Sequence, residues 1–191
     1  MDVVALLHPG IKQLSVGRRE GQWRPLPNTH KAILDTLYRA QYLQHLNISG
    51  VNTWDMLCQK CFLSLGLDHT SVKSEHNDIT NSEELLEHYL YLITDSLAGL
   101  PNLVSLNLGS LCSNNILRVV SNTCRQLREL RLRGPASVTD LGVRYLTGIN
   151  RSAQQTQAKD TPGCLNLEIL DLTDISLSLH TLTLLLIHLQ K

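Results

Sequence analysis

The sequence predicts an α/β fold made of repeated strand–helix units, a solenoid with short parallel strands on its concave face and helices on its convex face. The chain has 191 residues, about one in five of which is leucine, whereas aromatic residues make up only 4%. A hexapeptide pattern, L-x-x-L-x-L, recurs along the chain, and apolar residues with helical spacing follow its copies. Because aromatic side chains normally supply much of a globular core, a core built from one aliphatic residue favours a periodic fold.

Five copies of the hexapeptide mark the predicted strands. Three copies match completely, one has a single substitution and one is weak. In chain order they cover residues 11–16, 43–48, 103–108, 127–132 and 167–172. The third and fourth copies start 24 residues apart, at Leu103 and Leu127, which agrees with the period of a leucine-rich repeat, about 20 to 29 residues. We therefore predict a single leucine-rich repeat domain over residues 1–191, with about five repeats.

Polar insertions near residues 66–82 and 150–163 account for the longer intervals between the other copies. After the first insertion, the capping-box pattern Thr80-x-x-Glu83 predicts the start of a helix that continues to Ile93. The interval between the second and third copies also has room for one degenerate repeat. In a solenoid such insertions form loops on one face.

Side chains alternate along a strand, so the fourth and sixth residues of each motif point inward, and the third, fifth and seventh point outward. We expect the apolar residues of the helices to pack against the inward-facing strand residues. These helix residues are Ile33, Leu34, Leu37, Ile116, Leu117, Val119, Val120, Leu141, Val143, Leu146, Leu179, Leu182, Leu185 and Leu186. For almost every Leu, Ile and Val we therefore expect a position in the core.

The outward positions of the strands form the candidate partner-binding site. It consists of His45, Asn47, Ser105, Asn107, Glu129, Arg131, Arg133, Ile169, Asp171 and Thr173. If the last two strands are neighbours, Arg131 stands beside Asp171 in the sheet. Two interpretations are open for this pair. It is either an exposed cross-strand ion pair worth less than about 1 kcal/mol, or an anchor that binds a partner together with Arg133, because Arg is enriched at interface hot spots.

The fourth repeat carries a more specific pattern. Cys124 stands three positions before the first motif leucine, and the segment V-T-D-L-G-V at 138–143 follows the strand. This resembles the cysteine-containing leucine-rich repeats of the F-box/LRR and antagonist-of-mitotic-exit-network families. Cys164 keeps the same offset in the next repeat, but the family's second cysteine is replaced, for example by Pro135. The resemblance covers roughly residues 97–191.

The resemblance implies a right-handed solenoid of the ribonuclease-inhibitor type that recognises proteins, typically substrates destined for ubiquitination. It makes the chain a candidate for the substrate-recognition part of a ubiquitin-ligase receptor or adaptor, with ubiquitin-ligase subunits among its partners. Pro25-Leu26-Pro27-Asn28 has the L-P pair that opens an F-box, but a helix pattern leads from there directly into the strand at 43–48, so we find no F-box. The alternative is a standalone, inhibitor-like binding protein without a role in ubiquitination.

A metal or redox function is a less favoured alternative. Its basis is the pair Cys58 and Cys61, with His69 and His76 downstream. Zinc sites usually show a second cysteine pair or two closely spaced histidines, and neither is found here. No nucleophile elbow, phosphate-binding glycine loop or H-E-x-x-H helix occurs either. We therefore expect no catalytic residues, no metal, no cofactor and no enzymatic activity.

Charge and composition limit the remaining classes of function. The 17 basic and 17 acidic residues balance, which gives no basic surface for nucleic acid or for an anionic membrane. The longest apolar run, 177–189, is interrupted by polar residues and is too short to span a bilayer. Five cysteines and the absence of a signal peptide favour reduced thiols in an intracellular protein, cytoplasmic or nuclear. The terminal runs 3–7 and 184–191 are apolar and lack a polar cap, so we expect a fragment of a longer solenoid.

Overall fold

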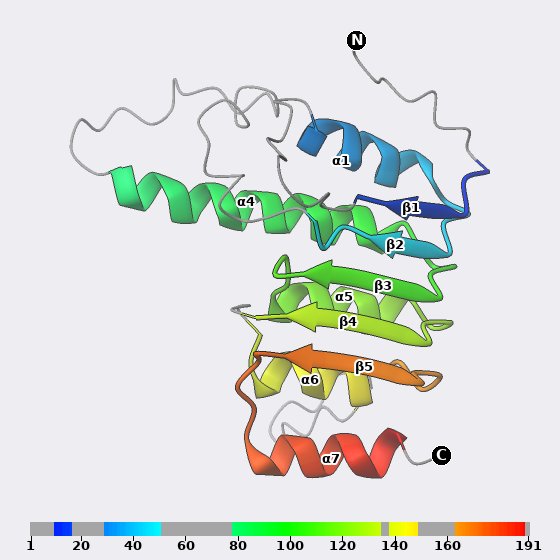
Figure 1. Cartoon of the computed structure of the whole chain (residues 1–191), viewed down its shortest axis with the longest axis vertical. Coiled ribbons are helices and arrows are strands. Elements are labelled where there is room, and N and C mark those ends of the chain that lie inside the picture. The colour runs from blue at the N-terminus through cyan, green and yellow to red at the C-terminus, as the bar shows by residue number, and fades with distance from the viewer. Residues whose placement is uncertain (1–9, 17–28, 51–77, 135–137, 149–162, 190–191) are drawn as a thin grey trace, which may run out of the picture.

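We describe a computed structural model of the chain, in which residues 10–16, 29–50, 78–134, 138–148 and 163–189 are described. Five strands alternate with helices along these residues (Figure 1). The strands are β1 (Gln13–Ser15), β2 (His45–Asn47), β3 (Ser105–Gly109), β4 (Glu129–Arg133) and β5 (Ile169–Thr173). The helices are α1 (Thr29–Arg39), α4 (Asp78–Ala98), α5 (Asn114–Thr123), α6 (Asp140–Thr147) and α7 (Leu179–Leu189). The predicted α/β class is confirmed.

Strands β1 and β2 lie within the predicted hexapeptides, and β3, β4 and β5 extend one residue beyond theirs. The five strands form one parallel sheet in the order β1-β2-β3-β4-β5. The fourth motif residues align across the sheet, because Leu46 pairs with Leu106, Leu106 with Leu130, and Leu130 with Leu170. Equivalent residues of successive copies are therefore neighbours in space. The hexapeptide repeat predicted both the strands and their register.

Each strand joins its neighbour through the same hydrogen bonds. At the β3–β4 junction the backbone N–H groups of Arg128 and Glu129 both donate to the carbonyl of Val104, at 2.8 and 3.0 Å. The pattern recurs at the other three junctions, where the accepting carbonyls belong to Lys12, Gln44 and Arg128. The chain thus enters every strand from β2 to β5 in one repeated geometry.

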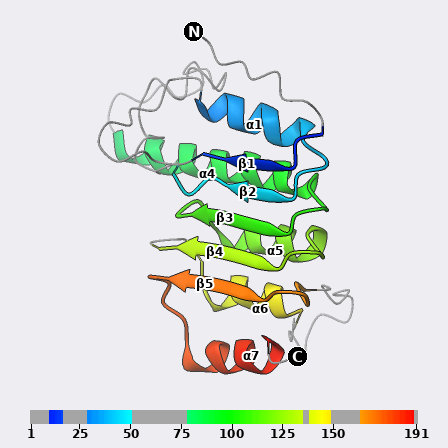
Figure 2. The same ribbon diagram turned by 45° about the vertical axis from the view of Figure 1, so that its right-hand side comes forward.

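The core lies between the sheet and the helices. Helices α4, α5 and α6 lie behind the strands in Figure 1, and the turned view in Figure 2 shows the same arrangement. The inward leucines of β2, β3 and β4 are buried, as predicted: Leu46, Leu106, Leu108, Leu130 and Leu132. The helices bury residues such as Ile33, Leu37, Ile93, Leu117 and Val143 against them.

Four of the helix residues that we expected in the core are exposed instead: Leu141, Leu179, Leu182 and Leu186. The reason is the orientation of the two helices. Helix α6 buries Val143 and Leu146, whereas Leu141 lies on its outer side. Helix α7 buries Thr181 and Leu185, and the other three leucines lie on the remaining faces of the helix.

The start of α4 also differs from the prediction. The helix begins at Asp78, two residues before Thr80, so Thr80 lies inside the helix and is not its N-cap. The continuation is as expected, with Tyr89 and Ile93 buried.

Several sequence predictions concern residues outside the described ranges. These are most of the insertions at 150–163 and 66–82, the proline-containing segment Pro25–Asn28, and the cysteine pair with its histidines. Among the described cysteines, Cys112, Cys124 and Cys164 are buried free thiols. No helix in the described part of the chain is long and apolar enough to cross a membrane.

Candidate functional site

The candidate site lies on the face of the sheet opposite the helices, which we call the open face. Outward strand residues of β2 to β5 form two rows across it. The first row is His45, Ser105, Glu129 and Ile169, and the second is Asn47, Asn107, Arg131 and Asp171. In the third row Arg133 pairs with Thr173, but a register shift places Gly109 opposite Leu132. The structure therefore brings all ten predicted site residues together on one face.

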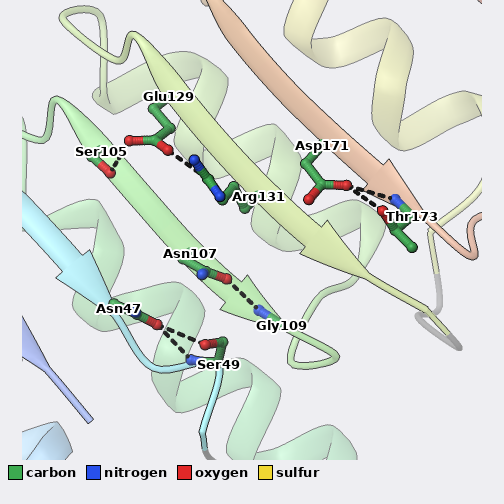
Figure 3. Close-up of polar contacts among 9 residues, drawn as sticks. All are labelled: Asn47, Ser49, Ser105, Asn107, Gly109, Glu129, Arg131, Asp171 and Thr173. Atoms are coloured by element: carbon green, nitrogen blue, oxygen red, sulfur yellow. Dashed lines mark hydrogen bonds and ion pairs between the residues drawn. The ribbon is translucent and has the colours of Figure 1, made fainter. Parts of the chain in front are cut away.

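Three side chains of the second row accept hydrogen bonds from the backbone two residues later, near the ends of their strands. The Oδ1 atom of Asn47 accepts hydrogen bonds from the backbone N–H of Ser49 at 3.1 Å and from its hydroxyl at 2.8 Å. Asn107 accepts the N–H of Gly109 at 3.2 Å in the same way. Asp171 accepts the N–H of Thr173 at 3.0 Å. Such bonds to the backbone two residues later form Asx turns, so these three side chains are held in fixed positions (Figure 3).

Arg131 is the exception in this row, because its side chain has no oxygen that could accept a hydrogen bond and form an Asx turn. It lies between Asn107 and Asp171 in the register. Its Nε donates to Oε1 of Glu129 at 2.5 Å, and Oε2 of Glu129 accepts the hydroxyl of Ser105 at 2.8 Å. The result is a hydrogen-bonded chain of three side chains across β3 and β4 (Figure 3).

This geometry bears on the first interpretation of Arg131, an ion pair with Asp171 on the neighbouring strand. The predicted adjacency of Arg131 and Asp171 is confirmed, but the ion pair of Arg131 is with Glu129 on its own strand. The carboxylate of Asp171 is instead engaged by the N–H and hydroxyl of Thr173. The cross-strand ion pair is therefore not formed. Arg131 acts on Asp171 only through its charge.

The acidic side chains of the open face are held in their charged forms. The hydrogen bond from Ser105, followed by that from Arg131, lowers the pKa of Glu129. The hydrogen bonds from Thr173 lower the pKa of Asp171, and the charges of Arg131 and Arg133 lower it further. At neutral pH the open face therefore presents fixed charges of both signs on neighbouring strands.

A second ion pair lies where the chain enters the last two strands. Nη1 of Arg128 lies 3.2 Å from Oε1 of Glu168, and both side chains are 63% exposed. An ion pair this exposed contributes little to stability, because solvent screens it. It joins the residue just before β4 to the residue just before β5.

Sequence reasoning missed two residues of the same face. Gln13 pairs with His45 and Ser15 pairs with Asn47, so both rows extend onto β1, where the two side chains are exposed. The signal was present in the weak hexapeptide at 11–16. The Asx turns were also missed, although an Asn or Asp at the fifth position of three motifs is visible in the sequence.

The open face offers polar, charged and apolar side chains for contact but no grouping suited to metal binding. Within the described ranges, no three His, Cys, Asp or Glu side chains are placed to hold a metal ion. Comparison with models of known protein families, with curated protein sequences and with solved structures gave no match.

Proposed function

We propose that this chain is a leucine-rich repeat solenoid that binds a protein partner on the open face of its sheet and carries out no catalysis. The parallel register and the repeated hydrogen bonds at the strand junctions support the solenoid. In such folds each repeat packs only on its neighbours, and the extended sheet surface is the usual place for binding.

The observation that carries this proposal is the fixed arrangement of side chains around Arg131. Its guanidinium group is held by Glu129, which is held in turn by Ser105, and the Arg131 side chain is still 49% exposed. A side chain already held in place loses less conformational entropy on binding, which lowers the cost of association. Arg residues in such positions are enriched among those that dominate binding energy.

The surroundings of Arg131 suit a protein partner with mixed polar and apolar side chains. Ile169 is exposed at the end of the first row, while Asp171 and Arg133 offer charges of opposite sign nearby. Protein interfaces combine such apolar contacts with a polar rim. The balanced charge of this face favours a protein partner over a polyanion, because phosphate binding relies on many unpaired Lys and Arg side chains.

For the biological role, we propose substrate recognition in a ubiquitin-ligase receptor or adaptor of an intracellular protein. The support is the repeat with Cys124, Thr139, Asp140 and Gly142, which resembles the cysteine-containing repeats of F-box/LRR proteins. The second candidate is a standalone, inhibitor-like binding protein. The observation that favours it is that no F-box pattern is found within residues 1–191.

The experiment is affinity capture from extracts of cells that produce the protein, followed by quantitative mass spectrometry. Three chains are compared: wild type, Arg131→Ala, and Arg118→Ala as a control for loss of an exposed arginine on helix α5. The proposal predicts a partner whose recovery falls at least about tenfold with Arg131→Ala, as for a hot-spot residue. Its recovery with Arg118→Ala should equal that with the wild type. If every captured protein were recovered equally with all three chains, binding at the open face would be contradicted.

The same captures distinguish the two biological roles. A ligase receptor should bring down a cullin together with Elongin or the adaptor subunit that binds F-box proteins, in amounts that rise when cullin activation is inhibited. Their absence alongside a partner that still depends on Arg131 would favour the standalone binder.

A further inference from the structure

Three neighbouring side chains of the second row carry N–H groups. Asn47, Asn107 and Arg131 lie side by side on β2, β3 and β4, because Asn107 pairs with both of the others in the register. We call these three residues the donor row. The side-chain amide of Asn has an oxygen that accepts and an NH2 group that donates, whereas the guanidinium group of Arg only donates. The contacts that these groups make within the chain decide what they offer a partner.

The Asx turns fix the orientation of the two amides. The backbone N–H groups of Ser49 and Gly109 donate to them, at 3.1 and 3.2 Å. A backbone N–H can only donate, so the oxygen of each amide must face it and the nitrogen must lie on the other side. Figure 3 shows this for Asn107, whose amide nitrogen lies on the side away from Gly109. The turns therefore use the acceptors of the two amides and leave their donors.

The amide nitrogens of Asn47 and Asn107 are both unpaired and accessible. Within the described ranges each of these amides takes part only in hydrogen bonds that its oxygen accepts. Both residues are half-buried. In the same ranges, however, only the Nε atom of Arg144 on α6 is a buried side-chain nitrogen without a partner. The two amide nitrogens are therefore open to solvent, and a partner on the open face can reach them.

Arg131 extends the free donors onto β4. Its Nε is bound to Glu129, but its terminal nitrogens donate to no group in the described part of the chain, and its side chain is 49% exposed. Arg133 follows two residues later on the same face and is exposed. It has no ion pair or hydrogen bond with any described residue. From β2 to β4 the second row thus presents N–H groups to solvent, with a second cationic side chain beside it.

Free donors beside cationic side chains suit a carboxylate. Neighbouring strands lie about 4.8 Å apart, so the two oxygens of one carboxylate can reach donors on two strands. Hydrogen bonds to an ionised acceptor are about twice as strong as those between neutral groups. Glu129 and Asp171, which flank Arg131 in the sheet, disfavour a phosphate, because a phosphate carries a charge of about −1.5 to −2. The single charge of an Asp or Glu side chain fits these surroundings better.

We propose that the partner presents Asp or Glu side chains to the donor row, and that the Asn107 amide and the terminal N–H groups of Arg131 bind one carboxylate between them. This inference rests on the proposed binding at the open face and names the chemistry of the partner. Asp171, next to Arg131 on β5, repels a second carboxylate. The acidic side chains of the partner therefore lie over β2, β3 and β4.

Asn107→Asp is the most specific substitution for a test. Aspartate keeps an oxygen that accepts the Gly109 N–H, so the Asx turn is retained, but it presents a carboxylate oxygen where the NH2 group was. Asn47→Asp makes the same change at the other end of the donor row. Asn122→Asp is the matched control, because Asn122 is an exposed asparagine on helix α5, away from the open face. Circular dichroism and urea unfolding show whether the three variants are folded.

The probes are peptides selected from a random display library on the full wild-type chain and then synthesised. Fluorescence polarisation measures their dissociation constants for the wild type and for each variant, Arg131→Ala included. We expect selected peptides that depend on Arg131 and are enriched in Asp and Glu. Asn107→Asp should raise their dissociation constant at least about tenfold, because it sets two carboxylates against each other. Asn47→Asp should weaken binding in the same direction, and Asn122→Asp should leave it unchanged.

A change in the peptide adds a rescue. Replacing its critical Glu by Gln, or Asp by Asn, supplies an N–H group, so the altered peptide should bind the wild type more weakly but recover part of its binding to Asn107→Asp. Peptides that depend on Arg131 but lack Asp and Glu, or bind Asn107→Asp as tightly as the wild type, would overturn this inference and leave binding at the open face intact. Peptides that bind Arg131→Ala as tightly as the wild type would contradict both proposals. A selection that yields no binding peptide would also overturn the inference.

Discussion

Asn114 at the start of α5 and Thr139 at the start of α6 lie 25 residues apart and exchange two hydrogen bonds of 3.0 Å. The side-chain amide donates to the Thr139 hydroxyl, and its oxygen accepts the Thr139 backbone N–H. Asp140 makes the corresponding bond to the N–H of Ser178 at the start of α7. Side chains at the helix starts therefore connect three consecutive helices in the same way.

The first prediction is that Asn114→Ala destabilises the protein by about 1–2 kcal/mol, because it removes two hydrogen bonds and leaves the Thr139 N–H without its partner. Asn115→Ala is the control, since Asn115 is the exposed neighbour of Asn114 on the same helix. It should change the free energy of unfolding by less than about 0.5 kcal/mol. Urea unfolding at neutral pH measures both, and equal effects of the two substitutions would contradict the role of the Asn114–Thr139 contact.

The second prediction concerns Gly142, which lies against the same asparagine. A Cβ at this position would come within 2.4 Å of Asn114 Oδ1 and 3.0 Å of Leu117 Cδ1. In an uncrowded helix, Gly→Ala stabilises by about 1 kcal/mol. Here we expect Gly142→Ala to destabilise by about 1–3 kcal/mol, as overpacking does.

A double-mutant cycle separates crowding by Asn114 from other effects of the alanine. In the Asn114→Ala background, Gly142→Ala should lower the free energy of unfolding by less than it does in the wild-type chain. Gly99→Ala is a control, because the nearest atom to a Cβ there, the carbonyl oxygen of Ser96, is at 3.4 Å. Additive effects of the two substitutions at 114 and 142 would show that the clash with Asn114 is not the cause.

The third prediction is a loss of stability in acid that depends on Asp140. The hydrogen bonds from Ser178 lower the pKa of Asp140 in the folded protein below its ordinary value of 3.8. The native state therefore favours the carboxylate. Its contribution is complete above the unfolded-state pKa and is lost as the pH falls through the lowered folded-state pKa.

Asp140→Asn tests this, because asparagine keeps an oxygen that accepts the Ser178 N–H but does not ionise. The free energy of unfolding, measured between about pH 6 and pH 2, should fall less steeply for the variant than for the wild type. The two chains should be closest in stability at the acid end of the range. Parallel curves would mean that Asp140 does not titrate with folding.

The fourth prediction is that Cys112, Cys124 and Cys164 are unreactive in the folded protein. Burial raises the pKa of each of these thiols to about 12, and the thiolate is the form that reacts. With an excess of iodoacetamide at about pH 8, peptide mapping should find all three unmodified in the native protein and modified after unfolding. Rapid native-state modification of Cys124, whose thiol donates to the Leu100 carbonyl at 3.5 Å, would contradict the packing of the repeat.

The sequence predicted the sheet because one short pattern fixes strand position, register and inward side at once. Leu46, Leu106 and Leu130 align as the hexapeptides require. Burial on α7 was not predictable in the same way. Leu179 and Leu185 are chemically alike, and only the position of α6 decides which of them is covered. Apolar spacing in a sequence shows that a helix has an apolar face, not that a neighbour covers it.

The candidate site was predicted as a set of residues but not as a network of contacts. Alternation along the strands placed Glu129 and Arg131 on the same face. Whether Arg131 would bind Glu129 or Asp171 depended on the competing bonds of Asp171 to Thr173, which register alone does not reveal. The Asx turns are local in sequence, so the i to i+2 pattern of Asn and Asp could have predicted them.

The central claim, that a partner binds the open face, is tested most directly by site-specific photo-crosslinking in cell extract. A photoreactive phenylalanine analogue replaces Ile169 on the open face in one chain and Leu141 on α6 in another, because the two residues are 48% and 49% exposed. We predict a discrete crosslinked protein from position 169 that is absent from position 141 and is lost when Arg131→Ala is added. The same adducts from both positions, or none from position 169, would contradict binding at the open face.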